Sequence, residues 1–189
     1  MIQKTRLYFL AFLCIVNIAA IAQANHPKLT LEDIYQNGTY RTKGFGPVRW
    51  MKDNNGYSTL ETNKEVDGKD IVRYDAASGN RTILVNARQL IPSGTKTPLA
   101  IANYEWSDDN NKLLIFTNTK RVWRYNTKGD YWVLDLKTGA LQQLGKSLPA
   151  ATLMFAKFSP DGLQVAYVSD LNIYTENLHT KKITQLTRD

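Results

Sequence analysis

Two kinds of hairpin alternate along this chain, and this alternation constrains the fold more than any other feature of the sequence. The first kind has an aromatic residue, a turn rich in Asp, Asn and Gly, and an apolar strand; it recurs at Trp50–Tyr57, Trp106–Phe116 and Phe158–Val168. The second kind has a strand, a polar turn and a returning strand; it recurs at Ile71–Leu84, Tyr131–Leu144 and Ile173–Leu186. Internal repeats of this kind indicate a fold built from one repeated unit.

The turns explain why each unit should fold back on itself. Asp and Asn bond to the backbone that follows them, and Gly adopts positive φ, so Asp161-Gly162 and Thr138-Gly139 can reverse the chain. Two hairpins in series make four antiparallel strands, and a four-stranded sheet repeated about every 40 to 60 residues is typical of a β-propeller blade. We therefore predict an all-β partial β-propeller. A β-sandwich with incidentally similar hairpins is the alternative, and three cycles of alternation favour the propeller.

The length of the chain does not fit a closed ring. At about 50 residues per blade, residues 25–189 supply about three blades, whereas a propeller needs 4–8. The last residues, 185–189, follow a strand and end on a turn residue in the middle of the pattern. We expect the chain to be the front part of a longer protein, with 25–189 an incomplete propeller domain.

Residues 1–24 are typical of a signal peptide. Lys4 and Arg6 precede the apolar run Leu7–Ile21, and Ala22-Gln23-Ala24 offers the small residues that signal peptidase cuts. An uncleaved anchor is the alternative, but the run is shorter than the roughly 20 residues that span a bilayer. We expect export to the periplasm, the cell envelope or the extracellular space. Cys14, the single cysteine, lies in the segment that would be removed.

Charge and metal-ligating residues point to no cofactor. The chain has 24 Lys and Arg against 17 Asp and Glu, and these charges are scattered without the basic stripe of a nucleic-acid surface. No Cys and His cluster has the spacing of a zinc site. We therefore predict no metal, no cofactor and no nucleic-acid partner.

The segment Lys120–Leu136, together with Phe158–Gly162, Val165–Val168 and Asn172–Tyr174, resembles the N-terminal propeller of the dipeptidyl peptidase IV branch of the prolyl oligopeptidase clan. The opening Leu29–Ile34 is similar to the start of the mature bacterial enzymes. The resemblance covers nearly all of residues 27–189. Its specific part is Trp123-Arg124-Tyr125 followed by Tyr131–Leu136, because many unrelated propellers carry the Phe-Ser-Pro-Asp-Gly turn.

The resemblance implies an eight-bladed propeller above a C-terminal α/β-hydrolase domain. Such enzymes release N-terminal dipeptides, preferably with proline or alanine second, from peptides with a free N-terminus. It implies that Arg124 reaches the carbonyl region of the bound dipeptide, and that Tyr125 lies in the substrate-binding segment. A guanidinium suits this role, because it offers a rigid fork of donors and stays charged. Without the resemblance, a surface salt bridge would be the simpler interpretation of Arg124.

The chain lacks the family's catalytic parts. The glutamate pair that holds the substrate amine falls beyond the point matching Asp189, and no Gly-x-Ser-x-Gly elbow occurs. His26 lies near the mature N-terminus, and His179 is expected to be a solvated turn residue rather than a general base. No catalytic residue is therefore predicted, and this chain alone should not hydrolyse peptides. Whether it forms a homodimer stays open.

Two functions remain as hypotheses. The first is the N-terminal propeller part of an exported dipeptidyl peptidase IV-like serine exopeptidase; the second is a non-catalytic envelope propeller that binds a peptide or protein partner.

We expect one short helical turn after Lys28, with Thr30 as its N-cap. An aromatic concentration could pack between blades or form a substrate-facing wall, and packing is expected except around Tyr125; its members are Tyr104, Trp106, Trp123, Tyr125, Tyr131 and Trp132.

Overall fold

The computed structural model describes residues 28–42, 44 and 46–188 of the 189-residue chain. The chain divides into two units, residues 1–45 and 46–189, which are described separately. The predicted signal peptide of residues 1–24, and His26, lie outside the described residues. Within the described ranges no helix is both long enough and apolar enough to cross a membrane.

The first unit contains the short helix α2 (Leu31–Tyr35). Thr30 is its N-cap, as predicted, and the Thr30 hydroxyl accepts a hydrogen bond from the Asp33 backbone N–H at 3.1 Å. The Thr30 hydroxyl also donates to the Asp33 carboxylate at 2.8 Å. Capping therefore explains this turn of helix, which buries none of its residues.

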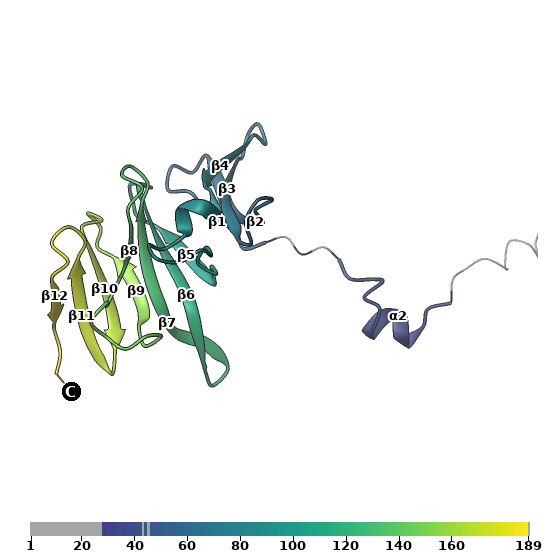
Figure 1. The fold of residues 1–189 in the computed structure, drawn as a ribbon. Helices are drawn as coiled ribbons and strands as arrows, with labels where there is room; N and C mark the ends of the chain where they lie inside the picture. Colours follow the sequence, from purple (N-terminus) through teal and green to yellow (C-terminus); the bar gives the residue numbers. More distant parts are fainter. Residues whose placement is uncertain (1–27, 43, 45, 189) are drawn as a thin grey trace, which may run out of the picture. The chain divides into compact units, whose positions relative to one another are not determined.

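The second unit consists of three four-stranded antiparallel sheets, in each of which strands adjacent in sequence are paired (Figure 1). We call them blades one, two and three. Blade one contains β1 (Arg49–Trp50), β2 (Gly56–Thr62), β3 (Lys69–Asp75) and β4 (Arg81–Val85). Blade two contains β5 (Asn103–Trp106), β6 (Lys112–Val122), β7 (Tyr125–Asp135) and β8 (Leu141–Gln143). Blade three contains β9 (Met154–Phe158), β10 (Gln164–Ser169), β11 (Asn172–Asn177) and β12 (Ile183–Gln185). The prediction of an all-β partial propeller is confirmed.

The first hairpin of every blade turns through the same left-handed position. Asn54, Asn110 and Gly162 have φ of 56°, 55° and 64°. In each case the N–H of this residue donates to the carbonyl three residues earlier, at 3.1, 2.9 and 2.8 Å respectively. Asn and Gly adopt this conformation at least cost, which is why the turns needed these residue types.

The second hairpins also share one turn. The side chain of the last residue of the third strand accepts hydrogen bonds from backbone N–H groups two and three residues on, as in Asp135 with Lys137 (3.0 Å) and Thr138 (2.8 Å). Asp75 and Asn177 take this role in blades one and three. The left-handed residue of these turns is Gly79 (φ 70°), Gly139 (φ 73°) and Lys181 (φ 61°).

The turn carboxylates make stability depend on pH. The Ser107 hydroxyl donates to Asp109 at 2.6 Å, and this bond, followed by bonds from Asn111, holds the pKa of Asp109 well below its usual range. A lowered folded-state pKa stabilises the fold above the ordinary value of about 4, and that stabilisation is lost as the pH falls below it.

We therefore expect the melting temperature to fall between about pH 4 and pH 2. Asp109→Asn should weaken this fall, because an amide does not titrate in this range. Asp108→Asn serves as the control, since its carboxylate pairs with exposed Lys52 at 3.0 Å outside the turn network. Thermal unfolding followed by circular dichroism at several pH values tests this, and identical pH profiles for Asp109→Asn and wild type would refute it.

The core lies between neighbouring blades. On β6, Leu113 and Ile115 pack in a cluster with blade one, whereas Leu114 and Phe116 pack in a cluster with blade three. Successive side chains of a strand point to opposite faces. Blade two is covered on both faces, so its second strand is a continuous apolar run instead of an alternating one.

In each blade, a buried polar side chain of the third strand is hydrogen-bonded to the segment that follows the blade. This side chain lies five residues before the last residue of that strand. These ties are Ala87 N–H to Asp70 (2.7 Å), Ala151 N–H to Asp130 (2.6 Å) and the Thr187 hydroxyl to Asn172 (3.2 Å). After blade one the linker begins with the 3₁₀ helix η1 (Ala87–Leu90), which the sequence analysis did not predict. Its N-cap Asn86 and Gln89 form a capping box.

Candidate functional site

The β6–β7 hairpin is longer than the other hairpins of the propeller. Both strands have 11 residues, against 7 and 6 for the second strands of blades one and three. In Figure 1 the end of this hairpin reaches beyond the neighbouring strands. We call residues 118–128 the arm. The arm starts where the register of the ladder shifts after Thr117, next to Asn118 with φ of 45°.

The base of the arm is fixed by polar bonds. The Asn118 amide donates to buried Asp130 at 2.7 Å, across the two strands. Gly129 pairs with Leu153 of the segment before blade three through two backbone hydrogen bonds of 3.0 Å. The arm therefore extends from a base that these hydrogen bonds hold in place.

The tip of the arm is a two-residue turn, Trp123-Arg124, between paired Val122 and Tyr125. Trp123 has φ of 59°, and positive φ at only the first central residue is the pattern of a type II′ turn, which usually has Gly there. The Arg121 Nε donates to the Trp123 carbonyl at 3.2 Å and supports the turn. A bulky residue in this region is a backbone outlier, of the kind that clusters at functional sites.

Arg124 and Tyr125, the predicted substrate-binding residues, thus lie side by side at the tip. Both side chains are exposed, Tyr125 to 74%. Within the described part of the chain, the Arg124 guanidinium makes no hydrogen bond or ion pair. The surface salt bridge considered as its simpler interpretation is not formed. The guanidinium is free to meet a ligand, and its role in substrate binding stays a prediction.

The expectation for the aromatic residues holds for Tyr104, Trp106 and Tyr131, which are buried in the clusters between blades. Trp123, two residues from the excepted Tyr125, is 91% exposed and does not pack between blades. The physical reason is the length of the hairpin, since the turn lies past the last residues that neighbouring blades can cover.

The arm is strongly electropositive. It carries Lys120, Arg121, Arg124 and Lys128, and residues 118–128 contain no Asp or Glu. Together with the exposed Trp123 and Tyr125 rings, these cations suit a ligand with carbonyl or carboxylate oxygens and apolar groups.

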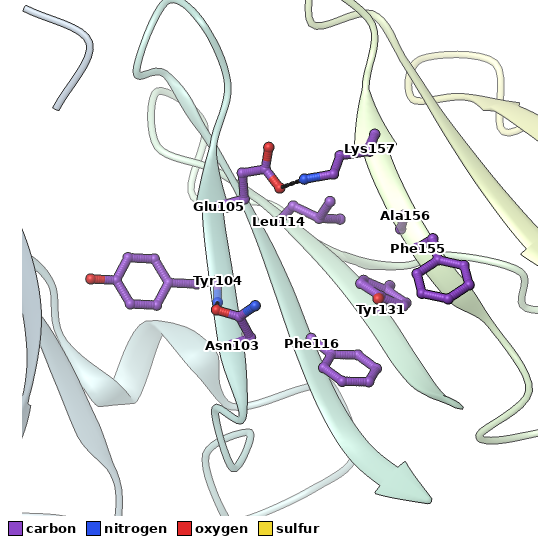
Figure 2. A pocket seen from close by; sticks show the side chains of 9 residues that line it. All are labelled: Asn103, Tyr104, Glu105, Leu114, Phe116, Tyr131, Phe155, Ala156 and Lys157. Carbon is purple, nitrogen blue, oxygen red and sulfur yellow. Dashed lines mark hydrogen bonds and ion pairs between the residues drawn. The ribbon is translucent and has the colours of Figure 1, made fainter. Parts of the chain in front are cut away.

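A pocket of about 180 Å³ lies where the base of the hairpin meets blade three. Figure 2 shows Phe116 and Tyr131 from blade two and Phe155 from β9 around it, with the Glu105–Lys157 ion pair at one side. The carboxylate and the ammonium are 2.5 Å apart. Phe155 was not predicted as a site residue, because nothing in its local sequence distinguishes it from other strand aromatics.

His179 and the side chain types that bind metals are the groups relevant to the prediction of no catalytic and no metal-binding residue. His179 is exposed in the β11–β12 turn, as expected, and its backbone N–H donates to Asn177 at 3.0 Å. Among the described residues, no three His, Cys, Asp or Glu side chains group as metal ligands would.

Comparisons with known proteins agree with this architecture. Residues 107–189 match the family described as the dipeptidyl peptidase IV (DPP IV) N-terminal region. A probable dipeptidyl-aminopeptidase B of Aspergillus oryzae is 30% identical over 143 residues, which cover 72% of this chain and 14% of that protein. One from Colletotrichum graminicola is 28% identical over 191 residues, covering 90% and 20%. The crystal structure of Porphyromonas gingivalis dipeptidyl peptidase 4 superposes with a TM-score of 0.71 at 26% identity, covering 88% of this chain and 22% of that one. The chain spans a fifth or less of the length of these curated relatives.

Proposed function

We propose that this chain, a dipeptidyl peptidase IV-like N-terminal region, serves peptide binding in an exported serine exopeptidase that releases N-terminal dipeptides. The chain contains no nucleophile elbow, so the hydrolytic step would come from a C-terminal α/β-hydrolase domain. The 189-residue chain alone is expected to be inactive. The proposal is supported by the family match and by the names of the curated relatives.

The observation that carries this function is the exposed Arg124 guanidinium at the tip of a rigidly based arm. A guanidinium can donate two parallel hydrogen bonds, so it can orient the carbonyl groups of an extended peptide. The strained turn at Trp123 holds the arginine beyond the blade, where a large ligand can reach it. Binding there would position the peptide, and bond cleavage would be left to the hydrolase domain.

The gene's complete reading frame provides the first test. We expect it to continue into a Glu-Glu segment and then a Gly-x-Ser-x-Gly elbow. A stop codon after residue 189 with neither motif encoded would overturn the exopeptidase proposal. In that case a saturable partner of the chain itself would support the non-catalytic binding module.

Replacing Arg124 by alanine in the full-length protein should lower kcat/KM for a Gly-Pro anilide by about 10- to 100-fold. The expectation rests on the roughly 1.5–3 kcal/mol of a hydrogen bond to a charged group. Labelling of the catalytic serine by a small fluorophosphonate should be unchanged, because that reagent does not need the dipeptide site.

Two variants serve as controls for this experiment. Lys120→Ala removes one positive charge from the same arm and should have little effect, which separates contact from long-range attraction. Arg124→Lys keeps the charge and loses the fork, and should recover only part of the activity. Equal loss of hydrolysis and serine labelling in Arg124→Ala would remove Arg124 from the substrate site.

A further inference from the structure

The pocket between blades two and three has aromatic rings on two sides. Phe116 and Tyr131, stacked with ring centroids 4.6 Å apart, form one side, and Phe155 of β9 forms another (Figure 2). Its volume of about 180 Å³ is comparable to engineered cavities of about 150 Å³ that bind benzene. This space is sufficient for a single ring or a branched side chain.

Phe155 is held at this pocket by a β-bulge. Lys157 pairs with Ala166 and Met154 with Val168, so two residues of β9, Phe155 and Ala156, lie opposite one residue of β10. Phe155 has φ of 55° and its side chain is 60% exposed. A large apolar residue in the left-handed region is strained, and bulges re-aim side chains next to functional sites. Packing alone gives no reason to keep this ring half in water.

Tyr131 lies beside the bulge. Burial raises the pKa of the Tyr131 hydroxyl, and hydrogen bonds from the backbone N–H groups of Ala156 and Phe155 oppose part of that rise. The ring that carries this hydroxyl group also lines the pocket. The bulge of β9 and the Tyr131 ring of blade two therefore both border the pocket.

The charges at the pocket cancel. Glu105 of β5 and Lys157 of β9 form an ion pair of 2.5 Å, and these are the two charged side chains among its lining residues. An ionic ligand would have to break this pair or lose its own hydration without a partner. The walls therefore favour a neutral apolar group.

We propose that this pocket binds one neutral apolar side chain, aliphatic or aromatic, of a peptide ligand. The choice of a peptide as carrier rests on the proposed function; the preference for a neutral apolar group rests on the pocket alone. Arg124 immediately precedes β7, and Tyr125, the first residue of β7, is six residues from Tyr131, or roughly 20 Å at about 3.3 Å per residue. A dipeptide spans about 7 Å, so the pocket would hold a residue well beyond the one that Arg124 contacts.

The test uses N-acetylated tripeptide amides, which lack the free amine of an exopeptidase substrate. Acetyl-Gly-Phe-Gly-amide should bind the full-length protein in an NMR titration, whereas acetyl-Gly-Gly-Gly-amide and acetyl-Gly-Lys-Gly-amide should bind at least tenfold more weakly. Phe155→Gly should weaken binding of the phenylalanine peptide by about tenfold, the scale of one aromatic contact.

Leu171→Gly is the matched control. Leu171 also has a positive φ of 63°, is 83% exposed and lies on blade three, but it does not line the pocket. Both glycine variants relieve strain, so neither should melt below wild type, and Leu171→Gly should bind the peptide normally. Equal affinity for the three peptides, or unchanged binding by Phe155→Gly, would overturn the proposal. Arg124→Ala should leave this binding intact, so a failed role for Arg124 would not be mistaken for a failed pocket.

Discussion

Replacing Gly129 by alanine is expected to lower the free energy of unfolding by about 3 kcal/mol, at the upper end of overpacking effects. An added Cβ would lie 2.5 Å from Phe116 Cε2 and 2.6 Å from the Thr117 carbonyl oxygen. The backbone cannot simply withdraw, because both Gly129 backbone groups bond to Leu153 at 3.0 Å on the other side. Thermal unfolding should show a melting temperature about 6 to 12 °C lower.

Gly44→Ala is the control for this substitution. Apart from Gly44 itself and its two chain neighbours, no described residue has an atom within 4 Å of the position that its Cβ would occupy, so its melting temperature should match wild type. Because the clash falls on Phe116, Gly129→Ala should also weaken binding of the apolar peptide. A melting temperature within 1 °C of wild type would show that the base of the arm yields easily, contrary to this account.

Replacing Glu176 by alanine should destabilise the protein by a similar amount, about 3 kcal/mol. Its side chain lies in blade three with only 3% of the residue exposed. The carboxylate accepts hydrogen bonds from the Gly145 N–H at 2.8 Å and the Tyr167 hydroxyl at 3.1 Å. Alanine would leave these buried donors without an acceptor, and two blades would lose a direct tie.

Two further variants separate the role of the Glu176 hydrogen bonds from the general effect of replacing a glutamate. In Glu176→Gln the carbonyl oxygen can occupy the Oε2 position and keep both short hydrogen bonds, whereas the 3.4 Å contact from Gln142 is lost. We therefore expect this variant to lower the free energy of unfolding by about 1 kcal/mol. Glu65→Ala removes an exposed glutamate that pairs with Arg88 and should cost less than 1 kcal/mol. Urea unfolding measures all three. Equal stabilities of Glu176→Ala and Glu65→Ala would contradict the role of Glu176 as an inter-blade tie.

Local chemistry explains why the turns were predictable. Asp75, Asp135 and Asn177 bond backbone groups two and three residues away, and Gly79 and Gly139 adopt the left-handed conformation that their residue type permits. Such bonds need no distant partner, so residue types and spacing are sufficient to infer them. The alternation of the hairpins then implied four strands per blade.

The candidate site was predictable only in part. Arg124 was singled out through the resemblance of its segment, but the rigid base of the arm depends on Asn118 meeting Asp130 across two strands and on Gly129 pairing with Leu153. The residue type of Trp123 by itself favours burial. The length of the hairpin overrides that preference, and residue type alone does not report it.

The pocket is formed entirely by tertiary contacts. Phe155 becomes exposed because β9 pairs with β10 through a bulge, and its neighbours Phe116 and Tyr131 come from another blade. The sequence by itself determined the strands, the turns and their grouping into blades, because these depend on interactions within a few residues. Only the tertiary structure decided which side chains meet between blades, because contacts such as Glu176 with Gly145, 31 residues apart, depend on how two blades stack.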